Sequence, residues 1–393
     1  MGNYSLFMNP SFLPTTSDEG KKYYKDFKQF DVIFVTGDPY YDHPLSGTAI
    51  IARLLDSKGY KVAIIPQPQR EEEYQICGRP KYFFCITSGL LDSMLANYTP
   101  MLKKRENVLV PERALMVYTQ NLKNLFKGCI TVIGGVEATI RRFTHFDYKE
   151  NILRRGILND TKADLLLFGS AERAILTLLE RMQNFIDSPF DKKLLEIAEK
   201  IKPQFNLNTI EGIAYRVKND KIPKESRKLP SYEDCVTDKA KFNLLTRIHY
   251  LLPDEAFVEP CGAGFIQHNR PEHTLTEKEM DIIYSLPFTR LLHPKAKNFA
   301  EQHGMVERLQ TSVVIGRGCW GSCSFCVIPL VQGKEIAKRS KESIVKEIES
   351  LYKQGHKKIN DLTLPTLNMY GSKCALYTHP EQISSPIIKE EIT

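Results

Sequence analysis

Short apolar runs alternate with helical segments through the first half of the chain, and this rhythm constrains the fold more than any other feature. Each run is five or six residues long and ends at or shortly before a glycine or proline. The segment from Gly47 to Ser57 carries apolar residues at helical spacing. Such runs are typical of strands buried on both faces of a parallel sheet. They lie at residues 31–36, 61–66, 82–87, 129–133 and 164–168. The pattern predicts an α/β fold with a doubly wound, flavodoxin-like or Rossmann-like domain.

Three cysteines lie close together in the last quarter of the chain. Cys319, Cys323 and Cys326 have the spacing C-x₃-C-x₂-C and follow an apolar run at residues 312–315 that ends in glycines. The spacing predicts a tight loop just past the carboxyl end of a strand, where α/β folds place their chemistry. Thiolates on such a loop are ligands for iron–sulfur clusters. A four-iron cluster held by three cysteines leaves one iron open to a small molecule.

Zinc is the alternative metal for this loop. Cysteines two to four residues apart also build zinc sites, and a structural zinc ion needs a fourth ligand. The nearest further ligands in the sequence are His356, Cys374 and His379. The spacing alone leaves both metals open.

The cysteine motif, with the aromatic Phe325 just before its last cysteine, resembles the signature of radical SAM enzymes. The resemblance implies that Cys319, Cys323 and Cys326 hold a [4Fe-4S] cluster whose open iron chelates S-adenosylmethionine, with Phe325 along the adenine. It implies an electron donor such as flavodoxin or ferredoxin as a partner, and reductive cleavage to a 5′-deoxyadenosyl radical. The cofactor performs the difficult chemistry in such proteins, while the chain binds it and excludes water.

Longer stretches resemble one branch of this superfamily, the YgiQ-type radical SAM proteins. The resemblance implies an N-terminal domain similar to cobalamin-binding folds, followed by a radical SAM (β/α) barrel. No substrate follows from it, small or macromolecular. The stretches that carry it lie at residues 35–44, 134–143, 162–173, 285–294 and 365–370.

Two departures from the family pattern concern the barrel. The family pattern has two glycines where this chain has Thr363 and Leu364, and side chains there would crowd a backbone that binds the methionine amino group. Only 67 residues follow Cys326, whereas the remaining barrel units need roughly 200 at about 30 residues each. We therefore expect an incomplete barrel. The alternatives to an active enzyme are a non-catalytic iron–sulfur or zinc-binding remnant, or one half of a split enzyme that a separate chain completes.

The predicted organisation has four parts. Residues 1–30 form a lead-in, 31–185 the flavodoxin/Rossmann-like domain, 186–310 a connector, and 311–393 a partial radical SAM domain. The connector is expected to contain a hairpin at 210–222, where Asn219-Asp220 marks a turn. After the cysteines, a helix at 341–354 capped by Ser340 and a strand at 357–364 indicate the β–loop–α–β start of a barrel.

Other motifs have two interpretations each. The loop with His43 is similar to a cobalt-ligating D-x-H-x-x-G loop, but the histidine is one place early, and local hydrogen bonding explains it better. Gly134-Gly135 and Gly169 to Glu172 follow strands and suit either an anion or nucleotide tail or tight turns.

Two arginine pairs, Arg141-Arg142 and Arg154-Arg155, suit phosphate or RNA, which would make the protein an RNA-modifying radical SAM enzyme. Solvated helix faces are the alternative interpretation of both pairs. Cys374 suits an auxiliary site near the cluster, and the other five cysteines, which lack metal spacing, are expected to be small apolar residues.

Composition indicates the compartment. The chain has 54 Lys and Arg against 47 Asp and Glu, a net charge of +7 that is not diagnostic of nucleic-acid binding. It has no run of 18 apolar residues, so no membrane span or membrane partner is expected, and its N-terminus has no secretory pattern. Nine scattered cysteines without an export signal predict a cytoplasmic protein with reduced thiols.

Overall fold

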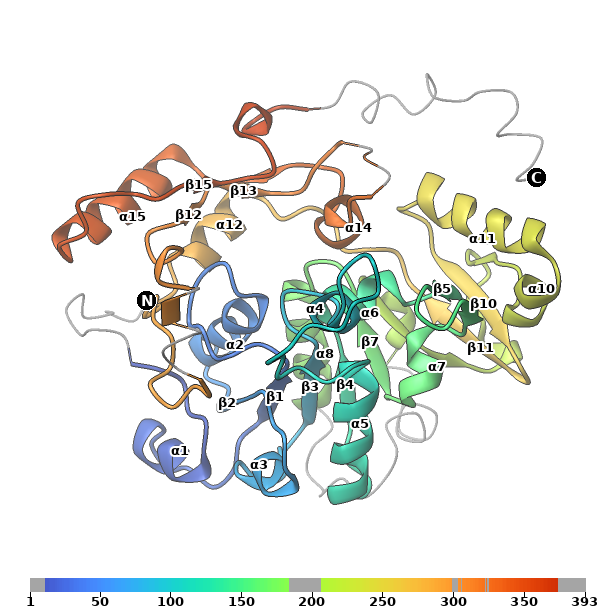
Figure 1. Cartoon of the computed structure of the whole chain (residues 1–393), viewed down its shortest axis with the longest axis horizontal. Helices are drawn as coiled ribbons and strands as arrows, with labels where there is room; N and C mark the ends of the chain where they lie inside the picture. Colours follow the sequence, from blue (N-terminus) through green and yellow to red (C-terminus); the bar gives the residue numbers. More distant parts are fainter. Residues whose placement is uncertain are drawn as a thin grey trace.

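A nine-stranded sheet is the centre of the computed structural model, which describes residues 11–183, 206–298, 303–304, 306–321, 323 and 325–373. Its strand order is β2-β1-β3-β4-β7-β8-β11-β10-β9 (Figure 1). The first five strands of this order are β1 (Val32–Thr36), β2 (Val62–Pro66), β3 (Phe83–Thr87), β4 (Thr131–Ile133) and β7 (Leu165–Leu167).

These five strands are the apolar runs predicted from the sequence, and all of them are parallel. Val32 on β1 lies between Val62 of β2 and Phe83 of β3, and β4 and β7 continue the parallel pairing. The order β2-β1-β3-β4-β7 is the 2-1-3-4-5 order of flavodoxin-like sheets, with its switch point between β1 and β3. The prediction of a parallel α/β sheet is confirmed.

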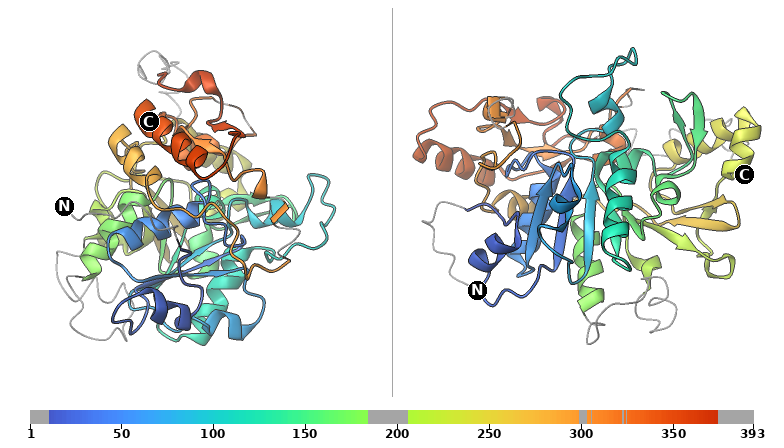
Figure 2. Two further views of the ribbon diagram at one scale, coloured as in Figure 1. Left: turned by 90° about the vertical axis from the view of Figure 1, so that its left-hand side faces the viewer. Right: turned by 60° about the horizontal axis from the view of Figure 1, so that its bottom comes forward.

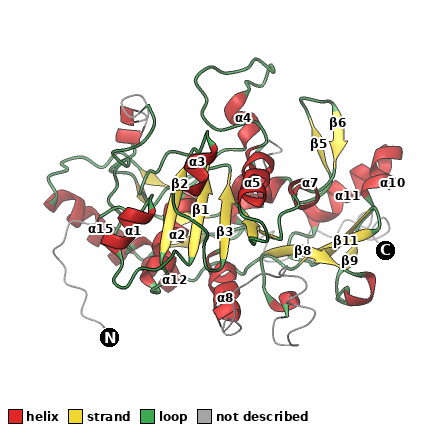
Figure 3. Ribbon diagram, turned by 90° about the horizontal axis from the view of Figure 1, so that it is seen from below, coloured by secondary structure: helices red, strands yellow, loops and turns green. Residues whose placement is uncertain are grey.

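Helices cover both faces of the parallel strands because successive side chains point to opposite sides. Val32 and Phe34 join one buried cluster with α2 (Gly47–Ser57) and α8 (Glu172–Gln183). Ile33 and Val35 join the other with α5 (Ala114–Leu125) and α7 (Ile157–Thr161). Figure 3 shows α5 and α8 on opposite sides of the row of strands. Further elements of this half are α1 (Ser17–Tyr23), α3 (Glu71–Gln75), α4 (Ser93–Asn97), α6 (Gly135–Ile140) and the small ribbon β5 (His145–Asp147) with β6 (Ile152–Arg154).

The sheet does not end at residue 185, because the region predicted as a connector supplies its other four strands. These are β8 (Ile213–Val217), β9 (Arg227–Lys228), β10 (Phe257–Cys261) and β11 (Gly264–His268). β8 pairs antiparallel with β7 on one side and with β11 on the other. Figure 2 shows these later strands continuing the row of the earlier ones. Helices α10 (Tyr232–Thr237) and α11 (Lys239–Leu251) and the short helix η1 (Leu207–Thr209) pack beside them.

The hairpin predicted at 210–222 is wrong. Residues 219–221 form a short 3₁₀ helix, η2 (Asn219–Lys221), and no strand follows it before β9. Pro223 has no N–H group to donate to a neighbouring strand, and Ile222 is the one apolar residue of the segment 218–222. Ile213 and Ala214 instead face the two opposite core clusters, which fixes β8 inside the main sheet.

A C-terminal segment lies over the end of the sheet at which the parallel strands finish (Figure 1, orange to red). Its strand β12 (Val313–Val314) pairs parallel with β15 (Leu362–Thr363), so the predicted second strand is present over two residues of the range 357–364. Ser340 accepts a hydrogen bond from the Ser343 N–H at 3.1 Å and caps the predicted helix, α15 (Lys341–Lys353). The other elements are α12 (Glu277–Tyr284), β13 (Gly316–Arg317), α14 (Ile328–Gln332), β14 (Ala337–Lys338) and η3 (Leu367–Met369).

Across the part of the chain that the structure describes, no helix is both long enough and apolar enough to cross a bilayer.

Candidate functional site

The cysteine loop connects β13 to α14, and its entrance is fixed by backbone contacts. Gly318 has φ +93°, and a Cβ at this position would overlap the carbonyl oxygen of Glu335, so only glycine fits. The Cys319 N–H then donates to the Gly333 carbonyl at 3.1 Å. These contacts place the three predicted cysteines on one loop that starts directly after a strand.

The three thiols of the loop are unpaired and reachable from solvent. Cys323 is exposed, and Cys319 and Cys326 are half-buried. The Cys326 N–H donates to the Cys323 carbonyl at 3.0 Å, which closes a turn between these two residues. Three free thiols on one loop fit an iron–sulfur cluster in their chemistry. Their side chains do not converge, because no three His, Cys, Asp or Glu residues in the described ranges group around one metal position.

The other residues predicted around the metal are less constrained. Phe325 is 87% exposed, so its ring packs little against the chain. His356 is half-buried just after α15 and joins no metal-ligating group of described residues. Cys374 and His379 lie outside the described residues. The described residues therefore offer no fourth ligand that would complete a structural zinc site with the three cysteines.

A cavity of about 490 Å³ lies between the carboxyl edge of the parallel sheet and the C-terminal segment. Its floor includes Gly89, Gly134 and Gly169, each in a loop that follows a parallel strand. Its roof includes Val314 and Val331, and its lining includes residues on both sides of the cysteine loop. The two glycine loops predicted as ligand sites thus do line a cavity, at the sheet edge where α/β proteins bind ligands.

This cavity contains a polar group that was not predicted from the sequence. Arg317, two residues before Cys319, pairs with Glu172 at 2.5 Å and donates to the Tyr284 hydroxyl at 2.7 Å. Both charged residues line the cavity. A usable signal was present, since Glu172 opens a helix after a strand and Arg317 precedes the cysteine motif.

His43 is fully buried and both of its ring nitrogens have partners. Nδ1 accepts the Leu45 N–H at 3.1 Å, and Nε2 lies 3.0 Å from a guanidinium nitrogen of Arg290. Burial, helped by the positive charge of Arg290, lowers the pKa of His43 to about 3, so the ring is neutral. This arrangement agrees with local hydrogen bonding and leaves no ring nitrogen free for cobalt.

The prediction of solvated helix faces is wrong for Arg141 and Arg142. Arg141 is buried and pairs with Asp92 at 2.7 Å. Arg142 is buried with its guanidinium 4.7 Å from the ring centre of Phe143 and 4.8 Å from that of Phe168. Burial of these two cations removes them from any surface for RNA.

The second arginine pair, Arg154 and Arg155, also forms ion pairs within the chain. Arg154 donates to Asp147 at 2.6 Å, and Arg155, half of whose side chain is exposed, pairs with Asp160 at 3.2 Å. The carboxylates of Asp147 and Asp160 balance the charges of both arginines, so this pair does not form a basic surface for RNA.

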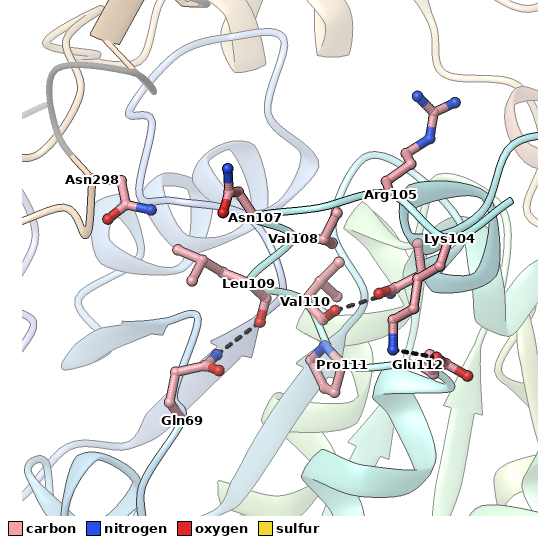
Figure 4. Close-up of a pocket in the computed structure, with 11 residues that line it drawn as sticks. Gln69, Lys104, Arg105, Asn107, Val108, Leu109, Val110, Pro111, Glu112 and Asn298 are labelled. Carbon is pink, nitrogen blue, oxygen red and sulfur yellow. Dashed lines mark hydrogen bonds and ion pairs between the residues drawn. The ribbon is translucent and has the colours of Figure 1, made fainter.

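A second cavity of about 400 Å³ lies beneath the loop at 104–112 (Figure 4). Gln69 donates to the Leu109 carbonyl at 2.7 Å, Asn97 donates to the Val110 carbonyl at 2.9 Å, and Lys104 pairs with Glu112 at 3.1 Å. Figure 4 shows these contacts as links among the lining residues themselves. These hydrogen bonds and the ion pair hold the loop in place, and they engage much of the polar lining of the cavity within the chain.

Comparison with curated proteins gives relatives that extend through the cysteine loop. A UPF0313 protein of Methanocaldococcus jannaschii is 39% identical over 380 residues, covering 92% of this chain and 59% of the relative. A UPF0313 protein of Geobacter sulfurreducens is 37% identical over 382 residues, covering 93% and 60%. The chain spans about three fifths of the length of these relatives. Because these matches leave out so little of this chain, they cannot stop before Cys319.

Comparison with solved structures gives the radical S-adenosylmethionine methyltransferase TsrM from Kitasatospora setae. With tryptophan substrate and a SAM analogue bound, it is 14% identical with a TM-score of 0.46, covering 82% of this chain and 46% of that one. With cobalamin and a [4Fe-4S] cluster bound, it is 12% identical with a TM-score of 0.47, covering 84% and 46%. At these scores the likeness adds no argument about this chain.

The family comparison decides the assignment. Residues 12–308 match the family described as Radical SAM N-terminal. The predicted cofactors, a [4Fe-4S] cluster and S-adenosylmethionine, are confirmed at the level of this family. The chain belongs to the Radical SAM N-terminal family.

Proposed function

We propose that this chain is a radical SAM iron–sulfur protein of the YgiQ type, in which Cys319, Cys323 and Cys326 hold the [4Fe-4S] cluster. The observation that carries the proposal is the loop itself. Three unpaired thiols follow a strand directly, and the loop adjoins a cavity large enough for a small organic molecule. The three cysteines support iron–sulfur ligation more than zinc, because a four-iron cluster with one open iron needs only these three thiolates, whereas a structural zinc ion needs a fourth ligand.

The chain's own residues would bind the cofactors and limit the access of water. When bound, the cluster would supply the electron that cleaves S-adenosylmethionine to a 5′-deoxyadenosyl radical, which removes a hydrogen atom from a substrate. Gly318 and the Gly333 carbonyl hold the start of the loop in place. Phe325, exposed beside Cys326, is available to cover an adenine ring.

The exposed side of the loop supports an electron-transfer partner, and the chemistry of the cluster supports a reducing compartment. Cys323 is exposed, so a small electron-transfer protein such as flavodoxin or ferredoxin can approach this side of the cluster site. Reduced thiols and an oxygen-sensitive cluster both fit the cytoplasm.

Anaerobic reconstitution with iron and sulfide tests the proposal. Electron paramagnetic resonance of the reduced protein should give a [4Fe-4S]⁺ signal that changes when S-adenosylmethionine is added, because the open iron gains a ligand. Cys323→Ala should abolish the signal. Cys261→Ala is the matched control, since Cys261 is a half-buried free cysteine at the end of β10, and it should retain the signal.

Two results would count against the proposal. A cluster signal that persists in Cys323→Ala would place the ligands elsewhere. Absence of any cluster in the wild-type protein, with stoichiometric zinc after purification, would assign the loop to zinc.

One observation favours a second candidate, a cluster-binding protein without catalysis. Leu364 occupies a position at which the family pattern has glycine, and its Cδ1 lies 3.0 Å from where a Cβ on Gly316 would be. A side chain packed here restricts the approach of the methionine part of S-adenosylmethionine to the backbone. A cluster signal that is indifferent to S-adenosylmethionine would identify this second function.

A further inference from the structure

The cavity over the sheet edge has three charged residues in its described lining, and one of them has no counter-charge. Glu172 and Arg317 pair with each other at 2.5 Å. The third is Asp38, which follows β1, and no cationic side chain of the described residues acts on its carboxylate. The lining therefore carries one unbalanced negative charge.

Asp38 lies at the switch point of the parallel sheet, where the loops after β1 and β3 meet. The Gly37 N–H donates to the Thr87 carbonyl at 3.1 Å, which joins the two loops directly after their strands. A Cβ on Gly37 would overlap the carbonyl oxygen of Ser88, so this close approach requires glycine. Doubly wound sheets bind their ligands at this position.

The turn that follows β3 fixes the position of the Asp38 carboxylate. Its Oδ2 accepts the Leu90 N–H at 2.7 Å. Gly89 has φ +105°, and a Cβ there would overlap Oδ1, so only glycine lets the carboxylate lie against this turn. Oδ1 accepts no hydrogen bond from a described residue and is not enclosed, and Asp38 is half-buried in the cavity lining. One carboxylate oxygen is therefore free to meet a ligand.

The Asp38 carboxylate is mostly ionised at neutral pH. Burial raises its pKa to about 6, although the hydrogen bond from Leu90 acts in the opposite direction. Arg317 does not balance this charge, because it pairs with Glu172, which follows β7. In the sheet β7 lies three strands from β1, or about 14 Å at roughly 4.8 Å per strand. An unbalanced carboxylate in a cavity partly removed from water attracts a cation.

S-Adenosylmethionine has the complementary charge. Its ammonium and carboxylate groups cancel at neutral pH, and its sulfonium leaves one net positive charge. Most of the other side chains that line the cavity are apolar, as Ile51, Ile175 and Val331 are, which suits the uncharged parts of the molecule. The volume of about 490 Å³ is in the range of sites for ligands of this size.

We propose that Asp38 binds the positive charge of S-adenosylmethionine and thereby selects this cofactor over its uncharged thioether relatives. The inference rests on the proposed function and adds to it a binding residue from the flavodoxin-like half of the chain. The cysteine loop belongs to the C-terminal segment, so the two halves of the molecule hold the cofactor between them.

Isothermal titration calorimetry of the full-length protein, reconstituted anaerobically with its cluster, measures this selection. S-Adenosylhomocysteine is the matched probe, because it lacks only the methyl group and the positive charge. The wild-type protein should bind S-adenosylmethionine about tenfold more tightly than S-adenosylhomocysteine, whereas Asp38→Asn should bind the two ligands within about twofold of each other.

Two controls show that the variant acts through charge. Asparagine keeps an oxygen that can accept the Leu90 N–H, so Asp38→Asn should give the wild-type electron paramagnetic resonance signal of the cluster in the absence of S-adenosylmethionine. Asp31→Asn is the matched substitution, because Asp31 lies at the other end of β1, accepts the Lys61 N–H at 2.8 Å and does not line the cavity. It should keep the wild-type preference between the two ligands.

Failure of this inference and failure of the proposed function appear in different measurements. A wild-type protein that forms no cluster, or that forms one and does not bind S-adenosylmethionine, would overturn both. If the wild-type protein binds S-adenosylmethionine, three results would overturn this inference alone. These are equal wild-type affinity for the two ligands, an unchanged preference in Asp38→Asn, and a loss in Asp38→Asn of the cluster or of both ligands equally.

Discussion

Glu259 lies on β10 in the interior, where its carboxyl group is only partly satisfied. One oxygen accepts the Thr144 N–H at 2.9 Å, and the other is buried without a partner among the described residues. Burial raises the pKa of Glu259 to about 7, although the hydrogen bonds from Thr144 act in the opposite direction. The folded protein therefore holds this proton at pH values where the unfolded chain, with a pKa of about 4.3, has released it.

This difference predicts a pH-dependent stability. Between about pH 4.3 and pH 7 the folded state binds more protons, so the stability contributed by Glu259 is greatest at low pH and falls as pH rises. Glu259→Gln removes this dependence. Relative to wild type, the variant should gain about 2 to 3 kcal/mol of unfolding free energy on going from pH 5 to pH 8.

Denaturant unfolding at the two pH values measures this gain. Glu180→Gln, at an exposed position of α8, is the control and should follow the wild type at both values. If wild type and Glu259→Gln differ by the same amount at pH 5 and pH 8, the carboxyl group does not titrate as expected.

At the residue scale, local motifs could be predicted from the sequence and distant pairs could not. The cysteine loop is a local pattern, and its position after a strand was predicted correctly. The partner of Arg141 is 49 residues away in Asp92, and that of His43 is 247 residues away in Arg290. Nothing in the spacing of either residue indicates such a partner. Buried charges therefore resembled surface charges in the sequence.

At the element scale, the same contrast separates the first five strands from the later ones. Buried parallel strands are continuous apolar runs, which a sequence shows directly. β8 carries Arg216, which donates to the Ala163 carbonyl at 2.6 Å, and β10 carries the buried Glu259 and Pro260. The two polar residues and the proline interrupt the apolar pattern by which a buried strand is predicted. The partners that allow Arg216 and Glu259 to be buried lie in other parts of the chain.

Helix α15 packs on β12 through Leu351, and one of its carboxylates adds two ion pairs to residues outside the helix. Glu347 pairs with Arg290 and with Arg339, and both arginines are buried. Glu347→Gln should lower the unfolding free energy by about 3 kcal/mol, because two buried cations lose their counter-charge. Urea unfolding at neutral pH measures the loss.

The matched control is Glu349→Gln, on an exposed position of the same helix, which should change stability little. Equal effects of the two substitutions would show that Glu347 is not the group that secures α15.

At the scale of the whole molecule, the continuous sheet makes its first half dependent on the second. Leu166 of β7 pairs with Ala214 of β8, and Ala214 and Ile266 belong to the core cluster beneath the first half. A fragment of residues 1–185 would expose β7 as an apolar edge strand, which favours aggregation.

We therefore expect the fragment 1–185 to lack cooperative thermal unfolding and to elute as aggregates. A fragment of residues 1–298 retains all nine strands and should unfold cooperatively. Calorimetry and gel filtration of the two fragments make the comparison. A sharp transition in a monomeric 1–185 fragment would contradict this dependence.

The cavity joins residues that the ribosome makes far apart in time. Its floor follows strands completed by residue 167, whereas its lining from the C-terminal segment begins at Tyr284 and ends at Pro365. Since synthesis proceeds from the N-terminus and early regions fold first, the floor is open to solvent or a chaperone while the roof is still being translated. A small molecule could therefore enter the cavity freely before the roof is made, whereas the roof narrows this entrance in the finished protein. The cysteine loop leaves the ribosome after the floor of the cavity.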